Sequence, residues 1–392
     1  MTDIEQAARL NTEAIAALRN RRGAEARRLA AEATSLAPAY LPAWLNLAAA
    51  CRLEKDIDAA LEAVEQILKQ DPHAFLAHLT KASLIEEKGL YRQAATVYDA
   101  AFRQLPSMDR LTPELRAAVE HGRQVQARCF AEMDVLLKED LRGLPKPATS
   151  AESRRMNGFM DILLQKRRRY VSEPTSFFYP GLPAIEFFDR EDFPWLPGLE
   201  AATATIQAEL AAVLANPDQD NGLEPYVQIE EGQPLMQWAG LNHSASWSAF
   251  HFSFYGLRNE RNCAACPRTA ALLESLPQPR IAGRSPAGMF SVLAPRTHIP
   301  PHTGVSNTRL LCHLPLIVPP GCAFRVGSLT REWSVGEGFV FDDTIEHEAW
   351  NRSDHQRVVM IFDVWHPHLS ADERVLITQV MTALDRFNAQ PG

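Results

Sequence analysis

The sequence predicts a multidomain α + β protein in which an all-α solenoid precedes a double-stranded β-helix (jelly roll). The first 140 residues contain few Gly and Pro and many Ala, Leu, Glu and Arg, which favours helices throughout. From Phe177 onward, Pro and aromatic residues become frequent, and short β-rich stretches alternate with turn residues. Many short strands separated by such turns are typical of an antiparallel double-sheet jelly roll.

The helical part repeats every 34 residues, as the spacing of Pro38, Pro72 and Pro106 shows. Small residues keep the same step at two further positions, namely Ala14, Ala48 and Ala82, and Ala26, Ala60 and Ala94. Small side chains let paired helices approach closely, and a Pro ends each second helix. This period is the tetratricopeptide (TPR) signature, so residues 1–141 are predicted to form a TPR-like solenoid. A generic helical bundle whose prolines align by chance is the alternative.

The repeat also places the individual helices. We expect helices at about residues 5–20, 24–37, 40–53, 57–70, 74–88 and 91–104, and a longer capping helix near 112–140. Solenoids of this kind offer concave surfaces to peptides or to a protein partner.

Residues 142–172 are predicted to connect the two domains. Turn residues dominate 142–152, and a basic helix is expected near 153–170, with Lys166–Arg169 as a solvated helix face. Residues 173–392 are predicted to form the jelly-roll domain. Candidate strands are 287–294, 308–317, 322–327, 338–342 and 357–365, and a closing helix is expected at 370–388.

Composition excludes several classes of protein. The 392 residues are 46% hydrophobic and carry a net charge of −8, whereas binding nucleic acid as the main partner requires clustered Lys and Arg. No run approaches the roughly 18 apolar residues of a membrane span, and no secretory signal opens the chain. The six cysteines are too scattered for a disulfide framework, so a cytoplasmic location is expected. Cys263 and Cys266 form a lone CxxC motif, interpreted as a structural loop, with a local disulfide or a redox role as alternatives.

Two histidines lie in settings that favour metal binding. His302 follows two prolines just before a strand, and His347 follows a short strand. In a jelly roll such positions can converge at one end of the barrel, and imidazole nitrogens suit Fe(II). The usual non-haem iron pattern has a carboxylate two residues after the first His, where this chain has Gly304. The residues alone therefore leave two alternatives: two histidines and a cosubstrate hold the metal, or these histidines are not ligands.

Polar side chains within apolar strands indicate a bound anion. Arg357 begins an apolar strand, and burial of a guanidinium is costly unless an anion pairs with it. A dicarboxylate cosubstrate would supply that anion, and Ser291 could donate a second hydrogen bond to the same carboxylate. Ion pairs of Arg357 with Asp363 or Asp354 are the alternative.

The strand after His302 carries two polar groups on one face. Arg309, Leu311 and His313 alternate onto the same side of this otherwise apolar strand. His313 is thus a candidate for the anion site, and a hydrogen-bonded core histidine is the alternative.

These residues lie in segments that resemble the aspartyl/asparaginyl β-hydroxylases. The resemblance covers about residues 175–370 and rests on His302–His313, Phe341–Trp350 and Asp363–Pro367, with Asn259–Cys263 as a further match. It implies a cupin-like oxygenase domain that depends on Fe(II) and 2-oxoglutarate and is joined to helical repeats. In that family two histidines hold the iron, and Gly occupies the third position.

Carried over by residue, the resemblance implies catalytic iron ligands at His302 and His347. Ser291 and Arg357 would bind the distal carboxylate of 2-oxoglutarate, and His313 would contact its metal-proximal end. Arg309 matches a residue that contacts the substrate.

The resemblance also implies a substrate, namely the β-carbon of Asp or Asn in a peptide or protein. Leu311 and Asn242 stand where animal members have arginines, which puts this substrate in doubt. A small molecule or a lipid acyl chain is the alternative substrate. Halogenation, with chloride at the position that Gly304 leaves open, is a second candidate reaction. An inactive repeat-based scaffold is a hypothesis of a different class.

Overall fold

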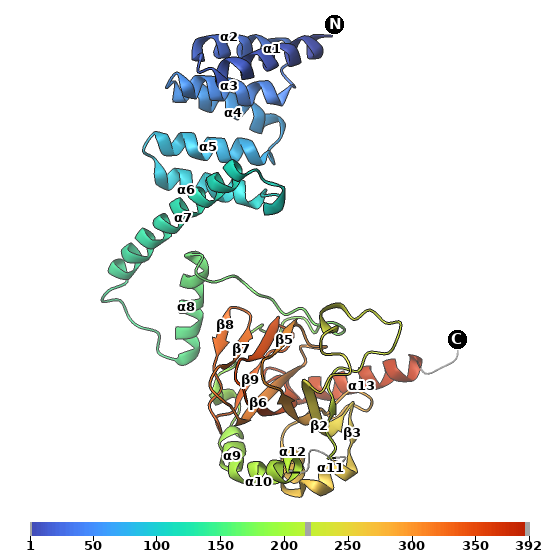
Figure 1. Ribbon diagram of the computed structural model, residues 1–392. Helices are drawn as coiled ribbons and strands as arrows, with labels where there is room; N and C mark the ends of the chain where they lie inside the picture. The colour runs from blue at the N-terminus through green and yellow to red at the C-terminus, as the bar shows by residue number, and fades with distance from the viewer. Residues whose placement is uncertain (1, 216–220, 389–392) are drawn as a thin grey trace. The chain divides into compact units, whose positions relative to one another are not determined.

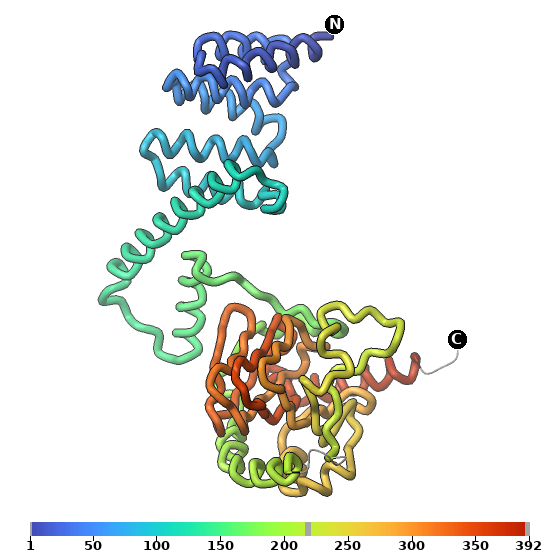
Figure 2. Tube along the Cα trace, in the orientation of Figure 1, coloured from blue at the N-terminus to red at the C-terminus, as the bar shows by residue number. Residues whose placement is uncertain are grey.

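The computed structural model describes residues 2–215 and 221–388. The chain divides into two compact units, Met1–Lys146 and Pro147–Gly392. The first is helical and the second is rich in β-strands, as Figures 1 and 2 show. No helix among the described residues is long and apolar enough to cross a membrane.

The first unit is built from consecutive helix pairs. Its helices are α1 (Asp3–Arg19), α2 (Gly23–Leu36), α3 (Leu41–Leu53), α4 (Ile57–Gln70), α5 (Phe75–Glu87), α6 (Tyr91–Arg103) and α7 (Pro113–Asp140), with a 3-10 turn at Met108–Arg110. These bounds lie within about two residues of the predicted ones. The predicted TPR-like architecture is confirmed.

The repeating alanines are the contact points of these helices. Ala14, Ala48, Ala82, Ala26, Ala60 and Ala94 are each at most 1% exposed. Each belongs to an apolar cluster formed by neighbouring helices. Because Ala is the smallest side chain with a Cβ, these positions allow close helix approach without the entropic cost of Gly.

The connecting helix is shorter than predicted. α8 (Ser150–Leu163) starts with a capping box, in which Thr149 Oγ1 accepts from the Glu152 N–H at 3.1 Å and Glu152 accepts from the Thr149 N–H at 3.2 Å. The prediction of a helix to residue 170 is wrong, so Lys166–Arg169 is not a helix face. Arg167 instead forms an ion pair with Glu186 in which both side chains are about 15% exposed.

Two antiparallel sheets form the second unit. The large sheet has the order β1 (Glu224–Pro225), β2 (Trp247–Phe254), β4 (Gly288–Leu293), β11 (Arg357–Trp365), β6 (Arg309–Ile317) and β9 (Phe339–Phe341), and β3 (Leu257–Arg258) pairs with β2. The small sheet has the order β5 (Thr297–His302), β10 (His347–Asn351), β7 (Cys322–Val326) and β8 (Leu329–Arg331). This arrangement confirms the predicted double-stranded β-helix.

The large sheet separates two apolar cores. One core lies between this sheet and the helices α9 (Leu196–Ala201), α10 (Thr203–Leu214), α11 (Glu260–Ala265) and α12 (Pro267–Ser275). The other core lies between the two sheets. Even-numbered residues of β11 from 358 to 364 pack on the helices, so Arg357 and Asp363 face the small sheet. α13 (Ala371–Asn388) closes the unit, close to the predicted 370–388.

The five predicted strands correspond to β4, β6, β7, β9 and β11, whereas β1, β2, β3, β5, β8 and β10 were not predicted. β5 contains Pro300 and Pro301, which argue against a strand in the sequence. β5 is an edge strand of its sheet, and its pairing with β10 shifts register at Pro300 and Pro301, so neither proline has a paired residue on β10. His302 and His347 were predicted at loop edges. In the structure His302 is the last residue of β5 and His347 is the first residue of β10.

The tight packing at the repeat alanines has a direct test. Ala14 is 0% exposed, whereas Ala16 on the same helix is exposed. Ala14→Leu is expected to lower the free energy of unfolding of the helical unit by about 1–3 kcal/mol, because the added methylenes have no space. Ala16→Leu is expected to change it by less than about 0.5 kcal/mol. Urea unfolding followed by circular dichroism measures both, and equal effects would contradict the assigned packing.

Candidate functional site

The pairing of β5 with β10 brings His302 and His347 together. The two residues are direct cross-strand partners, and their ring centroids lie 4.0 Å apart. Trp238 flanks His302 at 5.0 Å, and Phe341 flanks His347 at 5.5 Å between ring centroids. The sequence separates these histidines by 45 positions, and the sheet makes them neighbours.

Both imidazoles have one nitrogen engaged and the other available. His302 Nδ1 donates to the Pro300 carbonyl at 2.8 Å, and His347 Nδ1 donates to the Ile345 carbonyl at 3.0 Å. In a neutral ring this leaves each Nε2 unprotonated, the form that binds a metal. Burial lowers the pKa of His302 to about 3 and that of His347 to about 4, so both rings are neutral at pH 7.

A buried carboxylate fills the space beside Gly304. A Cβ added to Gly304 would overlap the Asp343 side chain, lying 2.7 Å from Oδ1 and closer still to Oδ2. The Gly304 N–H donates to the Asp343 carbonyl at 2.6 Å. Asp343 is 3% exposed, and its Oδ1 has no hydrogen-bond partner. Gly304 therefore excludes a ligand of its own and makes room for Asp343.

No group of three or more His, Cys, Asp or Glu side chains within residues 2–215 and 221–388 is arranged to hold a metal ion. A metal at the His302–His347 pair would therefore take most of its ligands from water or small molecules. Sites with two protein ligands are open enough for a chelating cosubstrate.

Unpaired donors surround a second part of the same core. Arg357 is 1% exposed, and no acidic side chain of the described chain forms an ion pair with it. Its Nε has no hydrogen-bond partner, and neither do Trp333 Nε1 and His313 Nδ1. Arg357 lies over the Trp333 ring at 4.8 Å, and the Trp333 and His313 rings are 6.3 Å apart. Burial lowers the pKa of Arg357 to about 10, which leaves it charged at pH 7.

The two alternative ion pairs of Arg357 do not form. Asp363 accepts from Ser285 Oγ at 2.8 Å and from the Ala287 N–H at 3.0 Å, and Asp354 pairs with Arg296. His313 was alternatively interpreted as a hydrogen-bonded core histidine, but its Nδ1 is buried and has no hydrogen-bond partner. Buried donors without partners are costly, so their arrangement fits an anion.

The Ser291 hydroxyl is oriented by a hydrogen bond from Trp247. It is fully buried, and its Oγ accepts from Trp247 Nε1 at 3.0 Å. The Ser291 carbonyl accepts from Arg357 Nη1 at 3.5 Å, so the two side chains are neighbours. Because the indole donates to Oγ, the hydroxyl hydrogen of Ser291 remains available for another acceptor.

Arg309 forms an ion pair with the carboxylate that lies beside Gly304. Its Nη1 is 3.3 Å from Asp343 Oδ2, and its side chain is 16% exposed. Leu311 lies across the strand pair from Phe341, and it adds an apolar group to the same face.

Asn242, where the resemblance suggested an arginine in animal members, is hydrogen-bonded within its own loop. Its Oδ1 accepts from the Ile229 N–H at 2.7 Å, and its Nδ2 donates to the Ile229 carbonyl at 3.1 Å. The side chain thus anchors its own loop through both polar atoms.

The CxxC cysteines belong to a core. Cys263 lies in α11 and Cys266 caps α12, and both are buried in the core under the helices. Both thiols are free, and Cys263 Sγ donates to the Phe252 carbonyl at 3.4 Å. Burial raises the pKa of Cys266 to about 12, so its thiol stays protonated and unreactive.

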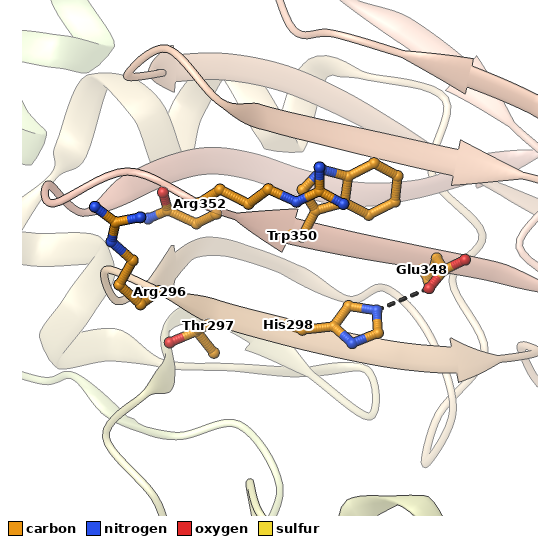
Figure 3. Close-up of a pocket in the computed structure, with 7 residues that line it drawn as sticks. Arg296, Thr297, His298, Glu348, Trp350 and Arg352 are labelled. Atoms are coloured by element: carbon orange, nitrogen blue, oxygen red, sulfur yellow. Dashed lines mark hydrogen bonds and ion pairs between the residues drawn. The ribbon is translucent and has the colours of Figure 1, made fainter.

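The outer face of β5 and β10 carries a separate polar groove, shown in Figure 3. It has a volume of about 570 Å³ and is lined by Arg296, Thr297, His298, Glu348, Trp350, Asn351 and Arg352. His298 Nε2 lies 2.7 Å from Glu348 Oε2, and Arg352 lies over the Trp350 ring at 5.1 Å. His298 thus shares a strand with His302 without sharing its site.

Sequence reasoning missed Asp343 and Trp333. Asp343 lies in a segment that carries the resemblance, but its contact with Gly304 spans 39 positions and leaves no local signal. A tryptophan is usually an apolar core residue, so its unpaired N–H is visible only in the structure.

The second unit is therefore a jelly-roll protein with a polar centre between its sheets. Residues 200–367 match the family model described as aspartyl/asparaginyl beta-hydroxylase. This part of the chain belongs to the aspartyl/asparaginyl β-hydroxylase family, as the resemblance implied.

Curated relatives support this membership. The human aspartyl/asparaginyl beta-hydroxylase is 39% identical over 157 residues, which is 40% of this chain and 20% of that protein. An ornithine lipid ester-linked acyl 2-hydroxylase from Rhizobium tropici is 33% identical over 199 residues, which is 50% of this chain and 66% of that protein. The chain thus spans a fifth of the human relative's length. Among solved structures, the TPR domain of Arabidopsis OM64 is similar to 31% of this chain and covers 98% of that domain, at 20% identity and a TM-score of 0.28.

The contact between Gly304 and Asp343 can be tested by a double-mutant cycle. Gly304→Ala is expected to lower the free energy of unfolding by about 1–3 kcal/mol, because the new methyl group overlaps the carboxylate. In an Asp343→Gly background the same change is expected to cost less than about 0.5 kcal/mol. Thermal unfolding of the four proteins measures the coupling, and additive effects would exclude this contact.

Proposed function

We propose that the second unit is an Fe(II)- and 2-oxoglutarate-dependent dioxygenase that hydroxylates a C–H bond. The observation that carries this proposal is the facing His302–His347 pair, with both Nε2 atoms available, beside the buried unpaired donors of Arg357, Trp333 and His313. A metal fits the first group and a dicarboxylate fits the second.

His302 and His347 would hold the iron through Nε2. Their Nδ1 hydrogen bonds to backbone carbonyls fix the ring orientations before any metal arrives. Asp343, close to His302 and with Oδ1 unpaired, would accept a hydrogen bond from a water molecule on the metal.

Arg357 and Ser291 would bind the distal carboxylate of 2-oxoglutarate. The guanidinium supplies charge and its unpaired Nε, and Ser291 supplies its free hydroxyl hydrogen. Trp333 Nε1 is a further donor to the same anion. His313, whose ring borders Phe341 at 4.8 Å, would contact the end nearer the metal.

When bound, iron with 2-oxoglutarate and oxygen supplies the oxidant that replaces a C–H hydrogen by hydroxyl, with succinate and carbon dioxide as coproducts. The protein positions these components and excludes water. Aromatic rings enclose the histidine pair on both sides, and such enclosure protects a reactive centre from side reactions.

The substrate is part of the proposal. The human relative is named for aspartyl and asparaginyl residues and the Rhizobium relative for an ester-linked acyl group. The sequence favours an Asp or Asn β-carbon, with an acyl chain or a small molecule as the alternative. Recognition of a peptide or protein partner by the TPR-like unit remains a prediction.

An inactive scaffold is the competing proposal. Replacing Arg357, Trp333 and His313 with apolar side chains would remove three unpaired buried groups and stabilise such a scaffold. Their presence therefore favours a working binding site.

Turnover of 2-oxoglutarate tests the iron assignment. With Fe(II) and oxygen, the wild-type protein is expected to form succinate slowly in the absence of substrate. His302→Ala and His347→Ala are each expected to lower this rate by more than about 100-fold, since even residues that only orient metal ligands matter 10–100-fold. His298→Ala, on the outer face of the same strand, is the matched control and should leave the rate unchanged. Absence of both turnover and Fe(II) binding in the wild type would overturn the proposal.

Arg357 gives a second test that does not depend on turnover. Arg357→Met is expected to raise the melting temperature of the protein without ligands, because an unpaired buried charge is removed. With Mn(II) in place of iron, 2-oxoglutarate should raise the melting temperature of the wild type but not that of Arg357→Met. Arg352→Met, at the exposed groove, should behave like the wild type. An equal ligand shift in wild type and Arg357→Met would contradict the assigned role.

A further inference from the structure

The closing helix α13 (Ala371–Asn388) lies at the edge of the second unit (Figure 1) and exposes a line of apolar side chains. Leu376 is 63%, Val380 62% and Phe387 73% exposed, and Ala383 is exposed as well. These four residues form the α13 stripe and follow one another at steps of four, three and four positions. Such spacing aligns side chains along a helix, and it is the spacing by which two helices pack against each other.

The exposed side of α13 lacks the charges that a solvent-facing helix surface usually carries. Residues 375–384 include no Asp, Glu, Lys or Arg, although Val375, Gln379 and Thr382 are exposed in addition to the stripe. The outer side of a helix that faces only water is normally polar and charged. An uncharged side over about three turns is therefore the kind of surface that another protein surface covers.

The contacts of α13 with its own domain use other sides of the helix. Ile377 is 6% exposed and belongs to a small apolar cluster of the second unit. Glu373 accepts a hydrogen bond from the Tyr179 hydroxyl at 2.9 Å, and Asp385 accepts one from Arg284 Nε at 2.9 Å. The helix is thus anchored near both ends and in its middle, so covering the stripe costs little backbone entropy.

The order of side chains in the stripe is complementary to its own reverse. In a pair of antiparallel helices related by a two-fold axis, each position of one helix lies opposite one fixed position of the other. With Leu376 opposite Phe387 of a second copy, Val380 lies opposite Ala383, because both pairs are centred on the same point of the helix. The central layers then combine a larger with a smaller side chain, which fills the space between the helices evenly.

A parallel pair would match each residue of the stripe with itself. Phe387 would meet Phe387, and Ala383 would meet Ala383, so two bulky rings would stand next to a gap. The helix dipoles would also point the same way, whereas the charges at the ends of antiparallel helices attract each other. The stripe therefore favours the antiparallel arrangement.

The charged residues beside the stripe are compatible with this arrangement. Asp372 lies near the start of α13 and Arg386 near its end, and neither forms an ion pair within residues 2–215 and 221–388. Antiparallel pairing puts Arg386 next to Gln379 of the second copy and on the same side as its Asp372. No like charges meet across the helix pair.

We propose that the α13 stripe is the contact surface of a homodimer in which the α13 helices of two copies pack in antiparallel directions. This inference goes beyond the proposed hydroxylase function and does not depend on it. A single pair of helices buries less than the roughly 1,600 Å² of a standard protein interface. The dimer is therefore expected to form reversibly, with a dissociation constant on the order of 10 µM.

Sedimentation equilibrium of the full chain, from about 1 to about 200 µM, measures this association. The wild type is expected to change from monomer to dimer across this range. Val380→Glu puts a carboxylate at the centre of the stripe and is expected to weaken dimerisation by at least about 30-fold, because a buried unpaired charge is costly. Val375→Glu is the matched control, since Val375 is 60% exposed but lies off the line of the stripe, and it should leave dimerisation unchanged.

Disulfide trapping under mild oxidation tests the antiparallel register. Leu376→Cys alone and Phe387→Cys alone are each expected to form no cross-link, because the two copies of either position lie at opposite ends of the helix pair. An equal mixture of the two variants is expected to form a disulfide-linked dimer, since these positions face each other. The wild type, whose native cysteines are buried or half-buried, gives the background.

Each outcome decides for or against the stripe. A chain that stays monomeric at the highest concentration would overturn the proposal, as would a dimer that Val380→Glu leaves intact. Cross-linking of a single variant with itself would replace the antiparallel register by a parallel one. Flotation with vesicles of phosphatidylcholine and phosphatidylglycerol tests the other occupant of such a face: vesicle binding that Val380→Glu abolishes, in a chain that does not dimerise, would assign the stripe to a lipid surface instead.

Discussion

The antiparallel register between β5 and β10 sets His302 opposite His347, and the proposed chemistry depends on this register. Side chains alternate between the faces of a strand, so a shift by one residue would turn a histidine away from the core. A histidine turned away in this way would lie on the outer face of the small sheet, where His298 on β5 pairs with Glu348 on β10. A bulge between His347 and Ala349 adjusts the pairing next to the site, as bulges often do near functional residues.

The core between the sheets contains buried polar atoms that lack hydrogen-bond partners, which destabilises the protein in the absence of a ligand. Arg357 Nε, Trp333 Nε1 and His313 Nδ1 give up water without gaining a hydrogen-bond partner, although apolar neighbours such as Phe324 pack tightly around these side chains. A protein tolerates such a departure from a well-satisfied core mainly where a ligand completes it. Arg357 lies over the Trp333 ring and the His313 ring lies next to that of Trp333, but these contacts leave Arg357 Nε, Trp333 Nε1 and His313 Nδ1 without hydrogen bonds.

The sequence predicted the elements whose cause is local and repeated. Alanines and prolines at a fixed period gave the helices, and apolar runs gave β4, β6 and β11. β5 was not predicted because it contains two prolines, which are found in strands mainly at a sheet edge. Whether a strand lies at an edge depends on the whole fold and is not visible in the local sequence. The prediction for Arg167 was wrong for a similar reason, because its partner Glu186 lies 19 positions away. The histidines were identifiable by type, whereas Asp343 became recognisable only through its contact with Gly304.

Leu311 is an apolar residue on the face of β6 that also carries Arg309 and His313. Its position on β6 is directly opposite Asp363 on β11, so an arginine here would lie beside that carboxylate and neutralise it. Because this position is leucine, Asp363 relies on Ser285 and the Ala287 N–H, and Arg309 is the cation that Asp343 and Asp363 share. Leu311 thus leaves this face of β6 with apolar surface and with Arg309 as its cation. The two buried carboxylates therefore depend on a single guanidinium together with hydrogen bonds from Ser285 and the Ala287 N–H, so loss of the Arg309 charge would leave both without a cation in a buried site.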